Sequence, residues 1–275
     1  MNLRKTLRRG LLWLLTLTLS QLALAVNGPQ YASHGMVVSQ NALASEVGTQ
    51  VLREGGNAID AAVATGFALA VTHPTAGNIG GGGFLVHRPA EDDAQTYDFR
   101  ETAPAGAHPE LWLDEAGNYD REKHHSSHLA VGVPGTVAGL YLAWEDGGSL
   151  PWARLVAPAI ALARDGFVVT HGLARSLSTG GLRRFKPYPA SVAQFTKNGT
   201  PYEAGDRLVQ SDLAATLERI AEAGPKGFYE GETADLLVKE IAANGGIITH
   251  DDLKAYAAVR RAPILGTYRG YDIIS

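Results

Sequence analysis

The chain has 275 residues, with 24 lysines and arginines against 28 aspartates and glutamates, which gives a formal net charge of −4. Apolar residues make up 45% of the chain and charged residues 19%, a composition that is typical of globular proteins and excludes a disordered chain of low hydrophobicity. The acidic balance argues against a nucleic-acid-binding surface, and the absence of cysteine excludes disulfides, thiolate metal sites and a cysteine nucleophile.

Residues 1–25 have the pattern of a secretory signal peptide. Positions 1–10 carry basic residues and no acid, an apolar run follows from Leu11, and the run ends in Ala23-Leu24-Ala25. The run of about 15 residues is shorter than the roughly 20 that a transmembrane helix needs; an uncleaved anchor is the alternative. We therefore expect a periplasmic or secreted protein, with residues 26–275 as the mature part and no membrane attachment after cleavage.

Hydrophobic periodicity predicts both helices and strands in the mature part. In chain order these are a strand at 35–39, helices at 40–54 and 58–71, strands at 84–87 and 96–100 that pair as a hairpin, a strand at 131–133, helices at 134–144, 155–164, 211–223, 232–243 and 251–257, and a final strand from residue 268. Residues 105–127 are predicted to be irregular, and residues 171–206 have too weak a period to assign. Long helices mixed with short strands indicate a layered α/β or α+β domain.

Capping residues mark the starts of three of these helices. Asn57 is expected to cap the helix at 58–71, and Ser211 the helix that begins there. Thr249 is expected to cap the last helix, with the acidic residue Asp252 three positions on. The helix at 58–71 is apolar nearly all round, which predicts that it is buried, packed against a sheet.

Two motifs invite functional readings that their surroundings do not support. Gly80–Gly83 lacks the lysine of a nucleotide-binding loop, so a tight turn in which backbone packs on backbone is expected, and a substrate-facing loop is the alternative. His124, His125 and His128 have spacings that could bind zinc on a helix, but the segment lacks helical periodicity, so a solvated loop is expected. We expect no metal site and no cofactor, and no Gly-x-Ser-x-Gly motif is present.

Arg100 is the candidate substrate-binding residue. It closes the apolar strand at 96–100 and is followed by Glu101. An arginine held at a strand end can bind a carboxylate through two parallel hydrogen bonds, a geometry that lysine does not offer. The alternative is an internal ion pair of Arg100 with Asp98 or Glu101, and the residues alone leave both open.

Seven stretches of the chain resemble the gamma-glutamyltranspeptidases (glutathione hydrolases), and they occur in the order of that family. They are residues 54–62 (EGGNAIDAA), 78–84 (NIGGGGF), 98–104 (DFRETAP), 128–139 (HLAVGVPGTVAG), 158–168 (PAIALARDGFV), 245–256 (GGIITHDDLKAY) and 268–271 (YRGY). The resemblance spans about residues 35–275 and implies the N-terminal portion of the family's large subunit.

The family resemblance implies an N-terminal-nucleophile hydrolase, an αββα sandwich that is incomplete in this chain. Such a precursor cuts itself, and the N-terminal threonine of the resulting small subunit attacks the gamma-glutamyl amide of glutathione or a related substrate. The gamma-glutamyl ester is then passed to water, an amino acid or a peptide. By position in the DFRE motif, Arg100 would bind the α-carboxylate of the donor.

The chain departs from the family because no threonine in it fits the Thr-x-His motif of the nucleophile. We therefore expect no catalytic residue in this chain, a small subunit as its partner, and no turnover by these 275 residues alone. Two alternatives remain open. One is an acylase of the same fold that acts on glutaryl-cephalosporins, and the other is an exported protein that binds an amino acid without catalysis.

Overall fold

The computed structural model describes residues 29–275, apart from the side chains of residues 179–181. The predicted signal peptide, residues 1–25, lies outside this range. The chain divides into two units, Met1–Met36 and Val37–Ser275, and the second unit contains all the helices and strands described below. No helix in the described residues combines the length and the apolar character needed to cross a bilayer.

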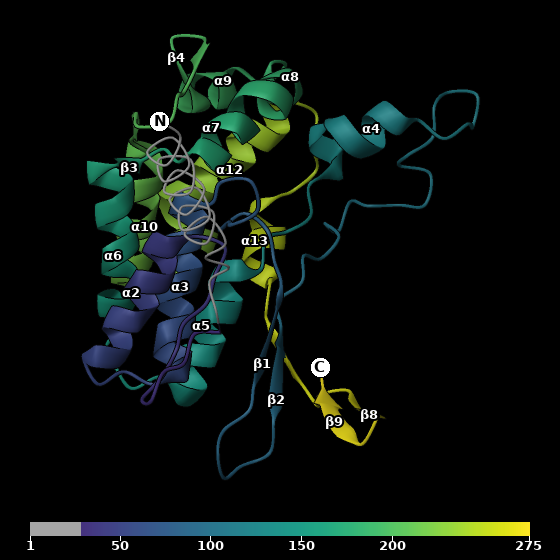
Figure 1. Ribbon diagram of the computed structural model, residues 1–275. Coiled ribbons are helices and arrows are strands. Elements are labelled where there is room, and N and C mark those ends of the chain that lie inside the picture. The colour runs from purple at the N-terminus through teal and green to yellow at the C-terminus, as the bar shows by residue number, and fades with distance from the viewer. Residues whose placement is uncertain (1–28) are drawn as a thin grey trace, which may run out of the picture. The chain divides into compact units, whose positions relative to one another are not determined.

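The second unit contains both helices and strands, which confirms the mixed α and β class (Figure 1). The helices are α2 Ala42–Arg53, α3 Ala58–Thr72, α4 Arg121–Ser126, the 3-10 helix η1 His128–Ala130, α5 Thr136–Gly147, α6 Trp152–Asp165, α7 His171–Arg175, the π-helix η2 Ser176–Gly181, α8 Leu182–Phe185, α9 Pro189–Phe195, α10 Ser211–Ala223, α11 Lys226–Tyr229, α12 Gly231–Ala243 and α13 His250–Ala255. The strands are β1 Phe84–His87, β2 Gln95–Asp98, β3 Phe167–Val168, β4 Thr196–Lys197, β5 Thr200–Pro201, β6 Arg207–Leu208, β7 Val259–Arg261, β8 Leu265–Tyr268 and β9 Tyr271–Ile274.

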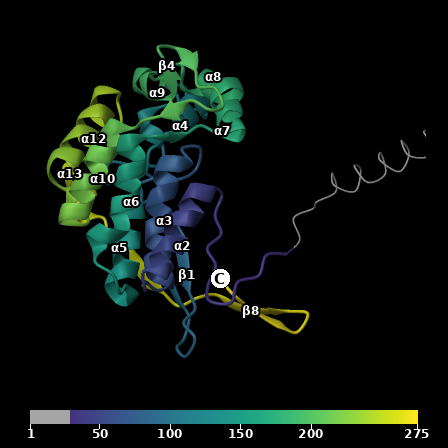
Figure 2. The same ribbon diagram turned by 60° about the vertical axis from the view of Figure 1, so that its left-hand side comes forward.

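Helix α3 is central to the helical layer, as Figures 1 and 2 show. Its apolar side chains are buried on nearly every side, as predicted. Its main neighbours are α2, α5 and α6, so the expectation that it packs against a sheet is wrong. Because three helices surround it, α3 has no need of a polar face.

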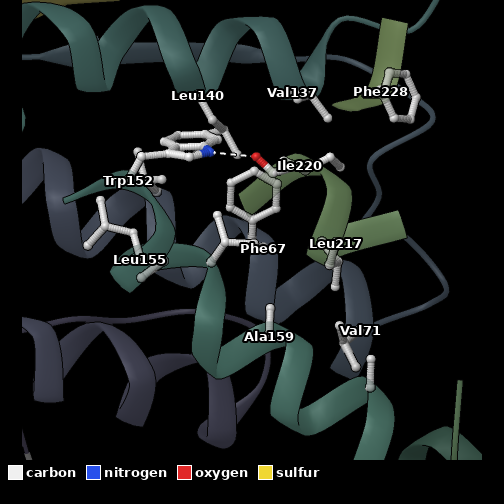
Figure 3. Packing of buried hydrophobic residues seen from close by; sticks show 14 of the residues in the cluster. Phe67, Val71, Val137, Leu140, Trp152, Leu155, Ala159, Leu217, Ile220 and Phe228 are labelled. Atoms are coloured by element: carbon white, nitrogen blue, oxygen red, sulfur yellow. Dashed lines mark hydrogen bonds between the residues drawn. The ribbon is translucent and has the colours of Figure 1, made fainter. Parts of the chain in front are cut away.

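Trp152 joins three helices in the core (Figure 3). Its ring lies edge-on against Phe67 of α3, with centroids 5.4 Å apart. Its indole nitrogen donates to the carbonyl oxygen of Ile220 in α10 at 2.8 Å, so the one polar atom of this buried ring is satisfied. Helix α6 begins directly after Pro151, at Trp152, three residues before the predicted start at residue 155, so the tryptophan lies in its first turn.

An antiparallel sheet in the order β1-β2-β7 lies beside the helical layer. The predicted hairpin is confirmed, with Phe84 opposite Asp98 and His87 opposite Gln95. Helix α5 packs against β2. Strand β7 was not predicted, because Arg260 and Arg261 leave this segment without the apolar pattern that is typical of a strand. In the described residues, the helical layer and this sheet account for part of the αββα arrangement.

Two of the three predicted helix caps are confirmed. Asn57 forms a capping box with Asp60 at the start of α3, and Thr249 forms one with Asp252 at the start of α13. Ser211, however, is inside α10, whose N-cap residue is Gln210. The Gln210 side chain instead donates to a carbonyl oxygen at the end of α3 at 2.9 Å, a tertiary contact that the local pattern does not reveal.

The remaining differences concern segments with few local signals. The predicted strand at 35–39 is absent, and residues 131–133 form only an isolated bridge, between Val133 and Thr102. The segment predicted to be irregular includes the short helix α4. The final strand is half of the hairpin β8–β9, which turns at Arg269 and Gly270, both with positive φ.

Candidate functional site

Arg100 follows β2 at the point where the strand leaves the sheet. Both polar groups of its main chain are bonded: the N–H donates to Oδ1 of Asp98 at 3.0 Å, and the carbonyl oxygen accepts from the Tyr256 hydroxyl at 2.9 Å. The side chain of Arg100 is 69% exposed. The main chain of this arginine is therefore fixed, while its guanidinium is open to a ligand.

The charged neighbours of Arg100 do not occupy its guanidinium. Asp98 forms its close ion pair with Arg261 of β7, at 2.6 Å, and uses its other oxygen for the Arg100 main chain. Both hydrogen bonds lower the pKa of Asp98, and the one from the Arg100 N–H has a larger effect than the one from the Arg261 side chain. The Nε atom of Arg100 lies 3.6 Å from Oε2 of Glu101, too far for a hydrogen bond. The internal ion pair considered as an alternative is thus limited to this loose contact.

Glu101 brings a carboxylate to the same place. Its Oε2 atom is buried and accepts no hydrogen bond from any residue that the structure describes. The side chain is packed between two glycines, because a Cβ atom at Gly82 would lie 3.0 Å from this oxygen and one at Gly132 would lie 2.9 Å from its Cβ. Arg100 and Glu101 together present one positive and one negative group, which is the complement of an amino-acid zwitterion.

A cavity of about 380 Å³ opens beside Arg100. Its lining residues come from the segment after β2 and from the segment before α5: Arg100, Glu101, Thr102, Ala103, Pro104, Ala107, Leu111, Trp112, Leu129, Ala130, Val131 and Gly132. The charged groups of Arg100 and Glu101 thus share a cavity with apolar side chains such as Leu111 and Trp112. Such a site can bind the charged end of a small molecule.

The glycine-rich segment is a close backbone contact, as predicted. A Cβ atom at Gly82 would lie 2.4 Å from the carbonyl oxygen of Phe99, so only glycine fits there. The carbonyl oxygen of Gly81 accepts hydrogen bonds from the N–H groups of Gly135 and Thr136 at the start of α5, at 2.7 and 3.0 Å. The segment therefore fixes the start of α5 next to the residues that follow β2 and include Arg100.

The three histidines lie on short helices and do not meet at one point. His124 and His125 are on α4, where the His124 ring packs at a tilt against Trp112 and shares a hydrogen bond of 2.7 Å with the Tyr119 hydroxyl. His128 is on η1, with Nε2 4.0 Å from Oε1 of Glu240. The expected solvated loop is thus partly helical. Within the described residues, no cluster of three or more histidines and acids could bind a metal ion.

Sequence reasoning missed Tyr256 and Asp252 as partners of the loop at residues 100–105. Asp252 accepts a hydrogen bond from the main-chain N–H of Ala105 at 2.7 Å, and Tyr256 donates to the Arg100 carbonyl. Both residues lie in one of the seven family-like stretches, but nothing in the local pattern signals a contact with a segment about 150 positions earlier. Their role became visible only through the tertiary structure.

The family model for gamma-glutamyltranspeptidase matches residues 44–275. The chain is 51% identical over 247 residues to the glutathione hydrolase proenzyme of Escherichia coli strain K12, a match that covers 90% of this chain and 43% of the relative. The crystal structure of Helicobacter pylori gamma-glutamyltranspeptidase superimposes with a TM-score of 0.87 at 47% identity, over 90% of this chain and 71% of that chain. A cephalosporin acylase from Bacillus halodurans gives a TM-score of 0.77 at 30% identity, over 91% of this chain and 49% of that one.

Proposed function

Because the chain belongs to the gamma-glutamyltranspeptidase family, we propose that it forms the donor-binding part of an enzyme that cleaves gamma-glutamyl amides such as glutathione. The chain spans less than half the length of the Escherichia coli relative. The complete activity is therefore proposed for a protein that contains these residues together with further ones. The observation that carries the proposal is the free guanidinium of Arg100 in a cavity beside a fixed main chain.

In this proposal Arg100 binds the α-carboxylate of the donor. A guanidinium can donate two parallel hydrogen bonds to a carboxylate, and among the residues that the structure describes only the loose contact with Glu101 competes for it. The side chain of Glu101 is 32% exposed, so its carboxylate can accept a hydrogen bond from the donor's ammonium group. The two charges would then hold the α-carbon end of the donor and leave its γ-carbonyl to the nucleophile.

The nucleophile proposed is the N-terminal threonine of a small subunit released from the same precursor. Its hydroxyl oxygen attacks the γ-carbonyl, its own α-amine accepts the hydroxyl proton, and the amine of the substrate leaves after taking up a proton. Water, an amino acid or a peptide then attacks the resulting ester and regenerates the threonine. Export to the periplasm or the medium is part of the same proposal and rests on the pattern of residues 1–25.

The test is the substitution Arg100→Lys in the complete protein, assayed with a chromogenic gamma-glutamyl anilide. Loss of one arm of the bidentate contact costs about 2 kcal/mol of donor binding, so we expect KM to rise about 30-fold. The 4-aminobutyryl anilide lacks only the α-carboxylate, and we expect its kcat/KM to be unaffected by the substitution.

Arg88→Lys is the matched control, because Arg88 is an exposed arginine in the turn between β1 and β2 whose guanidinium donates to nearby main-chain carbonyl oxygens. It should leave both anilides unaffected. An unchanged KM for the gamma-glutamyl anilide in the Arg100 variant would remove Arg100 from the donor site.

The comparisons do not favour the acylase alternative, since identity to the cephalosporin acylase is 30% against 51% to the glutathione hydrolase. A glutaryl anilide keeps the carboxylate of the donor but lacks its amine. If the complete protein prefers glutaryl to gamma-glutamyl anilide, the acylase function would replace the one proposed here. Turnover of neither compound, with binding of glutamate, would support a binding protein instead.

A further inference from the structure

Arg100 has a fixed main chain, and within residues 29–275 its side chain has no partner closer than Glu101. Its guanidinium is 69% exposed, and the nearest acidic oxygen lies 3.6 Å away. The direction in which this side chain leaves the sheet is therefore set by the main chain at residue 100. That main chain is held by Asp98 at the N–H and by Tyr256 at the carbonyl oxygen.

The Tyr256 hydroxyl is itself held by its surroundings. The ring of Tyr256 stacks on Tyr229, with centroids 5.7 Å apart and planes 5° apart. Tyr229 is buried, and its hydroxyl donates to the carbonyl oxygen of Pro134 at 2.8 Å. On another side the main chain of Gly135 comes so close that an added Cβ atom would lie 2.1 Å from the Tyr256 hydroxyl. The hydroxyl therefore has a defined position against which Arg100 is placed.

The segment that contains Tyr256 also holds the other end of the loop that begins at Arg100, at Ala105. Asp252 accepts from the N–H of Ala105 at 2.7 Å, and Asp252 is fixed by its capping box with Thr249. Helix α13 and the residue after it thus bracket residues 100–105 from both ends. This bracket is the reason that a loop can keep a defined shape at the edge of a cavity.

The geometry points to Tyr256 as a positioning residue that orients Arg100 for the α-carboxylate of the donor. The inference rests on the proposed donor-binding role of Arg100. Two parallel hydrogen bonds to a carboxylate require correct placement of the guanidinium, and a small displacement weakens both at once. Burial of Tyr256, together with the charges of Asp98 and Glu101, raises the pKa of Tyr256 to about 12, so its hydroxyl remains a donor at neutral pH.

The test is Tyr256→Phe in the complete protein, alone and combined with Arg100→Lys. Phenylalanine keeps the stack on Tyr229 and removes only the hydroxyl. One neutral hydrogen bond corresponds to a factor of about three to ten in affinity, so KM for gamma-glutamyl anilide should rise by that factor. The 4-aminobutyryl anilide should show no change in kcat/KM. In the Arg100→Lys background the second substitution should add nothing, because it acts through the arginine.

Tyr202→Phe is the matched control, since the Tyr202 ring lies near Lys197, in a segment that does not line the Arg100 cavity. Inhibition by free glutamate, compared with inhibition by 4-aminobutyrate, gives the same comparison without turnover. An equal loss with both anilides would mean a structural role and would overturn the inference, as would an unchanged KM in the Tyr256 variant. If Arg100→Lys itself has no effect, the donor-binding role of Arg100 fails, and the inference fails with it; if Arg100→Lys acts and Tyr256→Phe does not, only the inference fails.

Discussion

The substitution Asp60→Asn tests whether one buried carboxylate joins the start of α3 to the turn between α5 and α6. Asp60 is fully buried. Its Oδ1 atom accepts from the N–H groups of Ser149 and Leu150, at 3.0 and 3.3 Å. Its Oδ2 atom accepts from the Asn57 N–H at 2.9 Å and from the Ser149 hydroxyl at 2.5 Å. Both oxygens thus accept hydrogen bonds, and of the groups that donate to them only the Ser149 hydroxyl could also accept one.

Asparagine replaces one of these oxygens with an amino group. Whichever oxygen of Asp60 is replaced, at least one main-chain N–H at this buried carboxylate, that of Asn57 or that of Leu150, loses its acceptor and faces another donor. A hydrogen bond to a charged group contributes about 1.5 to 3 kcal/mol, and a buried donor without a partner costs about 1 to 3 kcal/mol. We expect the free energy of unfolding to fall by about 3 kcal/mol, which lowers the urea midpoint by about 1 M.

Tryptophan fluorescence reports on this region, because the indole nitrogen of Trp144 donates to the Leu150 carbonyl oxygen at 2.8 Å. Burial, the largest influence on Asp60, would raise its pKa, but the hydrogen bonds from Ser149, Asn57 and Leu150 outweigh it and lower the pKa. The stabilisation is therefore present above about pH 4 and is lost as the pH falls through the lowered value. The difference between wild type and variant should narrow in acid.

Asp120→Asn is the control for this experiment. Asp120 caps α4 through one oxygen only, Oδ1, which accepts from the N–H groups of Glu122 and Lys123. Asparagine caps as well as aspartate, so the urea midpoint should not move. The reasoning is refuted if Asp60→Asn is as well tolerated as Asp120→Asn, or if its cost is the same at every pH.

Two further pairs of variants test the packing and the polarity of the core. Gly139→Ala should lower the free energy of unfolding by about 1 to 3 kcal/mol, because the new Cβ would lie 2.0 Å from the Phe99 ring. Its control is Gly66→Ala, whose Cβ meets a leucine side chain at 3.2 Å and which should be neutral or stabilising by up to about 1 kcal/mol. Urea unfolding measures both, and equal effects would contradict the close contact at Gly139. Gln210→Glu puts a carboxylate against a carbonyl oxygen at a position that is 4% exposed, so the pKa of the new glutamate is raised and stability should fall as the pH rises from 5 to 8. Gln194→Glu replaces a more exposed side chain that makes the same kind of hydrogen bond, and its melting temperature should depend on pH no more than that of the wild type.

The long helices could be predicted from sequence because their signals are local. Apolar periodicity predicts α2, α3 and α12 within about two residues of their observed ends. Strand β7 could not be predicted in this way, since two of its three residues are arginines that form ion pairs with distant acids, Arg260 with Asp146 and Arg261 with Asp98. What makes this segment a strand is a partner that lies about 160 positions earlier in the chain.

The candidate site could likewise be predicted only in part from the sequence. Arg100 could be found from its place at the end of a strand and from the DFRE motif. The residues that hold it could not, because Tyr256 lies just after a helix and a tyrosine there is no signal of its own. Its contact with the Arg100 carbonyl spans 156 positions of the sequence. Only the fold brings the two together.

That span has a consequence for how the protein acquires its site. Contacts between residues so far apart raise the contact order of the fold. Closing such a long loop costs conformational entropy before the contact can contribute any stabilising free energy. The turn at Arg100 therefore cannot take its final shape when the hairpin β1–β2 first forms. We expect residues 100–105 to become ordered only when α13 docks, because Asp252 and Tyr256 supply the contacts that hold them.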